Sequence, residues 1–174
     1  MGKKKQPKID ERHARFALRI RRSRIDGWGV YAGETIPRGR LVIEYTGEKI
    51  SLPEAKRRLW RTCRNPRTRK LTMYGLGRYW RIDAAAGGSG AELVNHSCEP
   101  NLKPRIRRGR IFFFSLRRIP VKKELTVDYA ISPDTFQTPC RCGAKKCRGT
   151  INRLTKANRL AKANGLAQKG KRRK

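Results

Sequence analysis

Short stretches of alternating apolar and polar residues dominate the first half of the chain. Phe16, Leu18 and Ile20 alternate with arginines, which is the period of a half-buried strand with a basic outer face. Residues 41–45 form an apolar run after a glycine turn and predict a core strand. Residues 74–83 are typical of two short strands around two glycines. The pattern therefore favours a fold made of short strands.

One helix is predicted to begin after Ser51. Ser51 can accept a hydrogen bond from the first turn and Glu54 can reach back to it, which is the pattern of a capping box. Pro53 falls early in the helix, where its missing N–H does no harm. The Asn65-Pro66 pair ends the helix. The apolar positions of this helix lie four residues apart, at Ala55, Leu59 and Cys63.

A β-hairpin is predicted in the second half of the chain. Residues 102–107 and 110–116 alternate around the turn formed by Arg108 and Gly109. The apolar run at 111–114 is unbroken, so the second strand of the hairpin is expected to be buried on both faces. Residues 124–129 predict one more strand. The expected fold class is therefore mainly β with few short helices.

The charge of the chain is strongly unbalanced. Its 174 residues suffice for one domain with a real core, and they carry 45 Lys and Arg against 13 Asp and Glu, a formal net charge of +32. Such a field attracts polyanions, so DNA or RNA is an expected partner through non-specific electrostatics. The alternative is a solvated basic surface without specific binding.

No membrane association is expected. No apolar run approaches the ~18 residues of a membrane span, and the lysine-rich start lacks the apolar region of a signal peptide. Five cysteines are an odd number, which argues against a disulfide framework and favours a reducing, intracellular compartment. This would be the cytoplasm or nucleoid of a bacterium, or the nucleus and chromatin of a eukaryote. Cys63 is expected to be a half-buried free thiol on the helix.

Three cysteines stand close together in a pattern typical of metal binding. Cys140, Cys142 and Cys147 form C-x-C-x4-C, with a glycine that permits the turn. A structural zinc ion requires four soft ligands in a tetrahedron, so a fourth ligand is needed. Free or oxidised thiols are the alternative interpretation.

Two polar segments carry the strongest functional signal. Residues 95–101 read N-H-S-C-E-P-N, a poor strand and a poor helix, because asparagine side chains compete for backbone hydrogen bonds and proline removes a donor. Residues 124–129 read E-L-T-V-D-Y. The pair resembles the N-H-S-C-x-P-N loop and the E-L-x-x-D-Y strand of the SET-domain protein lysine methyltransferases, in a minimal form of the trithorax-like SET and post-SET pattern. A polar loop that happens to contain a histidine is the alternative.

The resemblance implies the SET fold, which consists of short β-sheets with a threaded, knot-like active site and a post-SET zinc segment. It also implies S-adenosylmethionine (SAM) as the cofactor, bound beside a lysine channel. Cys98 is implied as the fourth ligand of one structural zinc ion, with Cys140, Cys142 and Cys147. The chain then divides into a basic disordered arm, a SET domain, a post-SET zinc segment and a basic tail, at residues 1–14, 15–133, 134–152 and 153–174.

Individual roles follow from the family motifs. The implied cofactor-binding residues are Gly27, Trp28, Gly29, Tyr74, Asn95, His96, Tyr129 and Ile151. Tyr129 is implied as the principal catalytic residue, and Tyr45 of the Y-x-G motif as a second one that lines the lysine channel. Simpler alternatives are a plain turn for the glycines, a packing aromatic for Tyr45 and a buried structural histidine for His96.

Three positions depart from the family pattern. Where the family usually reads N-x-x-R-F-I-N, Ser89 replaces the first Asn and Glu92 replaces the Arg. The reversed charge at Glu92 is expected to affect cofactor affinity. Val127 stands where many members have Phe or Tyr, so we expect room for more than one methyl group on the product.

The expected function is therefore SAM-dependent protein-lysine N-methylation of a basic, nucleic-acid-associated protein, such as a histone or a histone-like protein. Automethylation is also expected on the arm, at Lys3, Lys4, Lys5 and Lys8. One alternative is a catalytically weak SET-fold protein that associates with nucleic acid. Another is a ribosome-associated binding protein.

Overall fold

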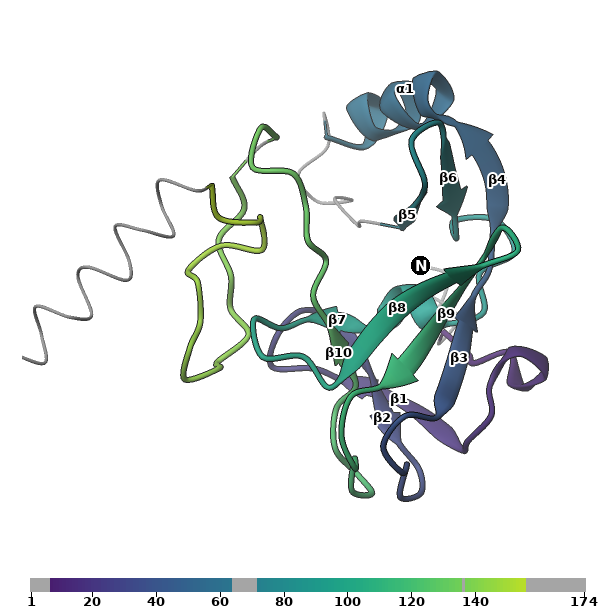
Figure 1. Cartoon of the computed structure of the whole chain (residues 1–174), viewed down its shortest axis with the longest axis vertical. Coiled ribbons are helices and arrows are strands. Elements are labelled where there is room, and N and C mark those ends of the chain that lie inside the picture. Colours follow the sequence, from purple (N-terminus) through teal and green to yellow (C-terminus); the bar gives the residue numbers. More distant parts are fainter. Residues whose placement is uncertain (1–6, 64–71, 136, 156–174) are drawn as a thin grey trace, which may run out of the picture.

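The computed structural model describes residues 7–63, 72–135 and 137–155, and these residues form a mainly β fold with one α-helix (Figure 1). The strands are β1 (Leu18–Arg22), β2 (Trp28–Ala32), β3 (Leu41–Tyr45), β4 (Glu48–Ser51), β5 (Met73–Leu76), β6 (Trp80–Asp83), β7 (Asn95–His96), β8 (Leu102–Arg107), β9 (Arg110–Ser115) and β10 (Thr126–Val127). The helices are α1 (Leu52–Cys63) and the short 3-10 helices η1 (Glu11–His13) and η3 (Ala91–Leu93). In these ranges no helix has the length and apolar character needed to cross a membrane.

The largest sheet has the strand order β3-β9-β8-β10-β7. β8 and β9 pair antiparallel from Leu102↔Ser115 to Arg107↔Arg110, which confirms the predicted hairpin. Phe113 on one face of β9 is 1% exposed and belongs to the hydrophobic core. On the opposite face Phe112 is only half-buried, so the strand is covered less completely than its apolar run predicts.

Two smaller sheets complete the β structure. β1 and β2 pair antiparallel, and β4, β6 and β5 form a three-stranded antiparallel sheet. The predicted strands near residues 16–21, 41–45 and 74–83 are therefore present. The sequence pattern did not predict β4, because its only buried residue is Ile50 and a single apolar position shows no period.

Helix α1 begins where the capping pattern predicts. The Ser51 hydroxyl accepts a hydrogen bond from the Glu54 N–H at 3.4 Å. Contrary to the capping-box prediction, the Glu54 carboxylate does not reach back to Ser51. It accepts hydrogen bonds from Arg57 and Arg58 at 2.8 and 2.7 Å. Arg58 also reaches Asp83 on β6 at 3.0 Å. This ion-pair network fastens the helix to the three-stranded sheet.

The apolar stripe predicted for α1 is wrong at one of its positions. Ala55 is buried, but Leu59 is 42% exposed. The helix lies against a sheet of three short strands, to which Arg58 is joined by ion pairs with Glu48 and Asp83, and this narrow sheet leaves Leu59 uncovered. The side chain of Cys63 lies outside the described part of the structure.

Two distant segments cross at the centre of the molecule, and we call residues 95–101 with 124–129 the crossing. β10 pairs in parallel with β7 through Thr126↔Asn95 and Val127↔His96. Next to this pairing, the Asn101 side chain takes the place of a neighbouring strand. Its Nδ2 donates to Glu124 O at 2.7 Å, and its Oδ1 accepts from Thr126 N–H at 2.9 Å. The predicted strand at 124–129 is therefore only two residues long.

Residues 7–14 are attached to the domain, so the expectation of a disordered arm is wrong for this part of it. Ile9 packs against the core, and the Asp10 N–H donates to Ser89 O at 3.0 Å. Ala14 forms an antiparallel bridge with Ile43 on the edge of β3. A single isoleucine and a free strand edge suffice for this docking, and neither produces a sequence period. Residues 1–6, with Lys3, Lys4 and Lys5, lie outside the described residues.

Residues 137–152 form a segment without regular strands, which we call the C-terminal flap (Figure 1). It is joined to itself by a bridge between Pro139 and Thr150, and to the preceding loop by a bridge between Ile131 and Asn152. The expected basic tail is described only to residue 155.

Candidate active site and cysteine cluster

Glu124 lies at the centre of a hydrogen-bond network at the crossing. Its Oε1 accepts from Asn95 Nδ2 at 2.8 Å and from the Ser23 hydroxyl at 2.7 Å. Its Oε2 accepts from the Tyr31 hydroxyl at 3.0 Å. A Cβ atom at Gly29 would lie 2.3 Å from Oε1, so any other residue here would displace the Glu124 carboxylate. The carboxylate thereby holds the Asn95 amide against β2.

The turn before β2 is bound to the same amide. Asn95 Nδ2 also donates to the backbone oxygens of Asp26 at 3.2 Å and Trp28 at 3.1 Å. Gly27, between these two residues, has a φ of +42°, a left-handed conformation that favours glycine. The structure therefore brings together Gly27, Trp28, Gly29 and Asn95, four of the residues expected to bind the cofactor.

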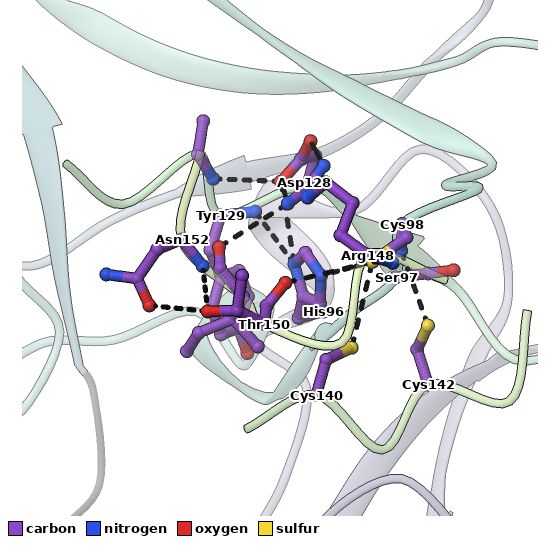
Figure 2. Close-up of polar contacts among 12 residues, drawn as sticks. His96, Ser97, Cys98, Asp128, Tyr129, Cys140, Cys142, Arg148, Thr150 and Asn152 are labelled. Carbon is purple, nitrogen blue, oxygen red and sulfur yellow. Dashed lines mark hydrogen bonds and ion pairs between the residues drawn. The ribbon is translucent and has the colours of Figure 1, made fainter. Parts of the chain in front are cut away.

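His96 is almost fully buried and is held at both ring nitrogens (Figure 2). Its Nδ1 accepts from the Tyr129 N–H at 3.2 Å, which leaves Nε2 as the protonated nitrogen, 3.5 Å from Cys98 Sγ. Burial lowers the pKa of His96 to about 4, so the ring is neutral near pH 7. His96 therefore links the backbone of Tyr129 to the cysteine cluster without carrying a charge.

Tyr129 is fixed at its hydroxyl end as well. The hydroxyl donates to Val94 O at 3.1 Å, and the ring packs edge-on against His96 with 5.4 Å between centroids. Burial, assisted by the nearby charges of Asp26 and Glu124, raises the pKa of Tyr129 well above its ordinary value. The phenol therefore stays protonated at physiological pH.

Tyr45 and Tyr74 pack with Phe113 in an aromatic cluster. The centroids of the two tyrosine rings are 5.4 Å apart and lie 5.9 and 5.7 Å from that of Phe113. The Tyr45 hydroxyl donates a short hydrogen bond to the backbone oxygen of Thr72. Burial raises the pKa of Tyr74 to about 12. Burial, with a smaller contribution from the charge of Glu92, also raises the pKa of Tyr45. Both phenols are neutral hydrogen-bonding groups.

The four thiols expected to bind zinc come together in the structure. Their sulfur atoms all lie within 4.8 Å of one another. Cys98 Sγ is 3.8 Å from the sulfur of Cys140 and 3.9 Å from that of Cys147. The sulfur atoms of Cys142 and Cys147 are 3.7 Å apart. With Zn–S bonds of about 2.3 Å, the edge of the ligand tetrahedron is roughly 3.8 Å, so the spacing fits a zinc ion.

Backbone N–H groups stabilise negative charge on these sulfur atoms. Arg148 N–H donates to Cys98 Sγ at 3.3 Å, and Cys98 N–H donates to Cys142 Sγ at 3.5 Å. Burial raises the pKa of Cys142, but backbone hydrogen bonds from Cys98 and Ala144 outweigh this effect and lower the pKa to about 6. A thiolate near neutral pH is the form that coordinates a metal.

A bidentate ion pair fastens the C-terminal flap to the crossing (Figure 2). Nη1 and Nη2 of Arg148 lie 2.6 and 2.8 Å from the two carboxylate oxygens of Asp128. Burial raises the pKa of Asp128, but these hydrogen bonds outweigh this effect and hold the pKa below its usual value. Because Arg148 follows Cys147 and Asp128 precedes Tyr129, the pair joins the cysteine cluster to the tyrosine site.

Asn152 is fully buried and closes the flap. Its Oδ1 accepts from Thr138 N–H at 3.0 Å, and its Nδ2 donates to Ser132 O at 3.0 Å. The Ile151 N–H donates to Thr138 O at 3.0 Å, so the same contacts fix its position. That Ile151 covers the adenine of the cofactor stays a prediction.

The positions that depart from the family pattern have local partners here. Ser89 is buried, and its hydroxyl donates to Glu44 O at 2.5 Å. Glu92 Oε2 accepts from Gly90 N–H at 2.9 Å at the start of η3. Val127 is buried in β10. The effects of Glu92 on cofactor affinity and of Val127 on the product stay predictions.

Three residues of this network received no role from the sequence, namely Glu124, Asp128 and Arg148. Glu124 and Asp128 belong to the E-L-T-V-D-Y segment, so their motif was recognised, but their partners Ser23, Tyr31 and Arg148 are distant in sequence. The signal available for Arg148 was its place next to Cys147. A basic residue next to a thiolate cluster is a plausible partner for a carboxylate, but the sequence does not say which carboxylate.

Comparison with known proteins places these features in a family context. The sequence profile of the SET domain matches residues 27–130. The H3 lysine-4 specific histone-lysine N-methyltransferase of Saccharomyces cerevisiae is 36% identical over 138 residues, which cover 75% of this chain and 13% of the yeast protein. Histone-lysine N-methyltransferase 2D of Homo sapiens is 36% identical over 139 residues, which cover 76% of this chain and 2% of the human protein. The chain thus spans only a small part of these relatives.

Solved structures resemble the described fold. KRYPTONITE in complex with mCHG DNA and SAH superposes with a TM-score of 0.66 at 30% identity, over 82% of this chain and 30% of that one. The methyltransferase domain of human histone-lysine N-methyltransferase SETMAR superposes with a TM-score of 0.69 at 25% identity, over 83% of this chain and 61% of that one. The architecture of short sheets around a crossing is therefore shared with these proteins.

Proposed function

The chain belongs to the SET-domain family, and from this premise we propose that it is a SAM-dependent protein-lysine N-methyltransferase. The observation that carries the proposal is the meeting of the turn at residues 27–29 with Asn95, His96 and Tyr129 at one crossing. These are the residue types that the family motifs assign to cofactor binding and catalysis, and here they contact one another.

The relatives support the choice of reaction. Those compared above are named histone-lysine N-methyltransferases, and the KRYPTONITE structures contain SAH, which is what remains of SAM after its methyl group has left. We infer that the methyl donor is SAM and that the acceptor is a lysine of a basic protein, such as a histone or a histone-like protein.

In this proposal the crossing binds the cofactor. The backbone of residues 27–29, together with Asn95 and His96, holds the methionine end, while Tyr74 lies at the lysine side and Ile151 covers the adenine. SAM, when bound, supplies an electrophilic methyl group on a sulfonium. The partly buried Glu124 positions the Asn95 amide and does not itself reach the reacting atoms.

Tyr129 and Tyr45 are the proposed catalytic residues. A lysine with a reference pKa of about 10.4 has to lose a proton before its nitrogen can attack. Both phenols stay protonated because burial raises their pKa, so they orient the amine through hydrogen bonds and do not accept its proton. Alignment of the amine in a channel that excludes water is the main contribution expected from the protein.

The cysteine cluster is proposed as a structural zinc site. Cys98 comes from the crossing, whereas Cys140, Cys142 and Cys147 come from the flap, so one ion would join the two. All four protein ligands are sulfur, which leaves no open position for a catalytic water. Zinc would therefore serve to hold the flap over the cofactor site.

A second candidate function is that of a catalytically weak SET-fold protein that associates with nucleic acid. The net charge of +32 favours it, as does the carboxylate of Glu92, which stands where the family usually has an arginine. Automethylation of the N-terminal arm is compatible with either candidate. Lys8 is the one arm lysine in the described residues, and it adjoins η3 through its backbone near Gly90.

Incubation of the protein with radiolabelled SAM and with core histones or a bacterial histone-like protein tests the proposal. Mass spectrometry then identifies the labelled residue. Label on a lysine side chain is the expected result, with more than one methyl group after prolonged reaction because Val127 is small. Label on another residue type, or no transfer by zinc-loaded folded protein to any basic protein, would contradict it.

A further inference from the structure

The outer face of the β3-β9-β8 part of the sheet carries basic side chains above aromatic rings. The strand register places Lys103 opposite Phe114 and Arg105 opposite Phe112 on this face. The face continues onto β3 at Glu44, which lies opposite Phe112. Figure 1 shows the three strands as direct neighbours. The register therefore makes this one continuous surface.

The guanidinium groups on this face are held by the rings beneath them. Those of Arg105 and Arg107 lie 4.8 and 5.3 Å from the centroid of Phe114, and that of Arg110 lies 5.2 Å from the centroid of Phe112. Phe114 is only 8% exposed as a result. Because the cations are already ordered, they lose little further freedom when they bind an anion.

Most of these cations are not neutralised by the protein itself. The Glu44 carboxylate accepts hydrogen bonds from Nε and Nη2 of Arg110 and lies 3.1 Å from His13 Nδ1, and the Arg110 hydrogen bonds hold the pKa of Glu44 below its usual value. Within the described residues Lys103, Arg105 and Arg107 form no ion pair. On α1, by contrast, Arg57 and Arg58 are paired with carboxylates.

A basic cleft extends the face beyond β3. The cleft has a volume of about 440 Å³ and is lined by Arg15, Phe16, Gly39, Arg40 and Leu41. Leu41 lies opposite Phe114 in the sheet, so the cleft adjoins the aromatic layer. Two further arginines thus lie at the β3 edge of the face, with β9 between β3 and the row of cations on β8.

We propose that this basic sheet face binds the phosphate backbone of duplex DNA. Its members are Lys103, Arg105, Arg107, Arg110, Arg15 and Arg40. The first three stand two residues apart, about 6.6 Å along the strand, which gives a regular row of charge for a regularly charged backbone. The rings lie under guanidinium groups, which disfavours the base stacking that single strands need. None of the six side chains is a hydroxyl or an amide, so the 2′-OH groups of RNA would find no dedicated partner.

The proposed surface lies on the other side of the sheet from the tyrosines. Phe113, whose side chain points away from the basic sheet face, contacts Tyr45 and Tyr74. Bound DNA would therefore leave the tyrosine site uncovered. A basic protein on the same DNA would be held near the enzyme at a raised local concentration. The binding itself does not depend on methyl transfer.

The test is the salt dependence of duplex DNA binding, measured by fluorescence anisotropy with zinc-loaded protein and no SAM. The triple variant Lys103→Gln, Arg105→Gln, Arg107→Gln should reduce the slope of log affinity against log salt by about 2.7, at ~0.9 per lost phosphate contact. The matched control Lys56→Gln, Arg61→Gln, Arg78→Gln removes the same charge from α1 and the β5–β6 turn. It should change the slope by less than about 1.

Two further readouts keep the proposal testable should the Gln variant unfold. The pair Arg105→Lys, Arg107→Lys keeps the charge and should keep the slope. DNA should also protect Lys103 of the unmodified protein from an acylating reagent and leave Lys56 reactive. The proposal is overturned by equal loss in both triple variants, by absent protection of Lys103, or by tighter binding of single-stranded DNA or duplex RNA of equal length. Failure here would leave the methylation assay unaffected.

Discussion

The crossing and the C-terminal flap lie against each other but are held together by different forces. In the crossing, the buried Asn101 and the partly buried Glu124 bond to backbone and side-chain groups from several parts of the chain. In the flap, residues 137–152, only Asn152 is buried. The flap is held by hydrogen bonds, by one ion pair and by three thiols that converge on Cys98. A segment with so little buried apolar surface cannot offset its loss of conformational entropy alone.

The difference indicates how the two regions depend on a ligand. The crossing should persist without any bound group, because its polar atoms already have partners. The flap should form only when a metal joins its three thiols to Cys98. Since His96 and Asp128 connect the two regions, the state of the flap should be felt at Tyr129.

Metal removal should separate the two regions most strongly. Chelation, or Cys142→Ser, should abolish ordered packing of the flap and reduce methyl transfer to background, because metal binding and folding of such a segment are coupled. Elemental analysis should find one zinc per chain in the untreated protein. In the metal-free protein, limited proteolysis should cut within residues 137–152 and spare the sheets. Full activity in a folded, metal-free protein would contradict the zinc assignment, and Cys63→Ser should leave the metal content unchanged.

Gly29→Ala should damage the crossing and leave the flap intact. The added Cβ would push the Glu124 carboxylate away from Asn95, at a cost of about 2 kcal/mol in unfolding free energy, together with weaker SAM binding. Gly75→Ala is the matched control, because its Cβ would meet no atom within 4 Å. Denaturant unfolding and calorimetry measure both effects. Equal stability of the two variants would show that Glu124 is not a structural hub.

Asp128→Asn should weaken the connection between the regions. Loss of the charge on the partner of Arg148 should lower zinc affinity roughly tenfold, because Arg148 also donates its backbone N–H to Cys98 Sγ. A competition titration with a chromophoric chelator measures this. Asp134→Asn, at an exposed carboxylate of the preceding loop, should leave the affinity unchanged. An unchanged zinc affinity in Asp128→Asn would show that the ion pair does not support the metal site.

Tyr45→Phe should have the smallest effect of the four changes. It removes one hydrogen bond to Thr72 O, worth ~1 kcal/mol, so the rate should fall about fivefold or the number of methyl groups should shift. Tyr79→Phe on an exposed ring is the control. Product analysis by mass spectrometry distinguishes the two results, and an unchanged rate and product would leave Tyr45 a packing residue only.

The sequence predicted elements whose signal is local. The hairpin at Arg108 and Gly109 and the start of α1 at Ser51 follow from turn and capping chemistry, and the structure has both. The cysteine spacing likewise predicted three of the clustered thiols, and the family resemblance supplied Cys98. Such features need no knowledge of distant neighbours.

The features that were wrong or missed depend on contacts between distant residues. Residues 7–14 dock because the edge of β3 is free, and Leu59 stays exposed because the sheet beneath α1 is narrow. Glu124 accepts hydrogen bonds from Ser23 and Tyr31, which lie about a hundred residues earlier in the chain. None of these facts leaves a period or a motif in the sequence.

Calorimetric titration of SAM into zinc-loaded protein, followed by a single-turnover rate on a basic protein substrate, tests the proposed function most directly. Wild-type protein should bind SAM at one site and transfer its methyl group to lysine. Tyr129→Phe should bind SAM nearly as well and react about a hundredfold more slowly, because the hydroxyl orients the reacting amine. A folded, zinc-loaded protein that binds no SAM, or a Tyr129→Phe protein with the wild-type rate, would contradict the assignment of this crossing as a methyltransferase site.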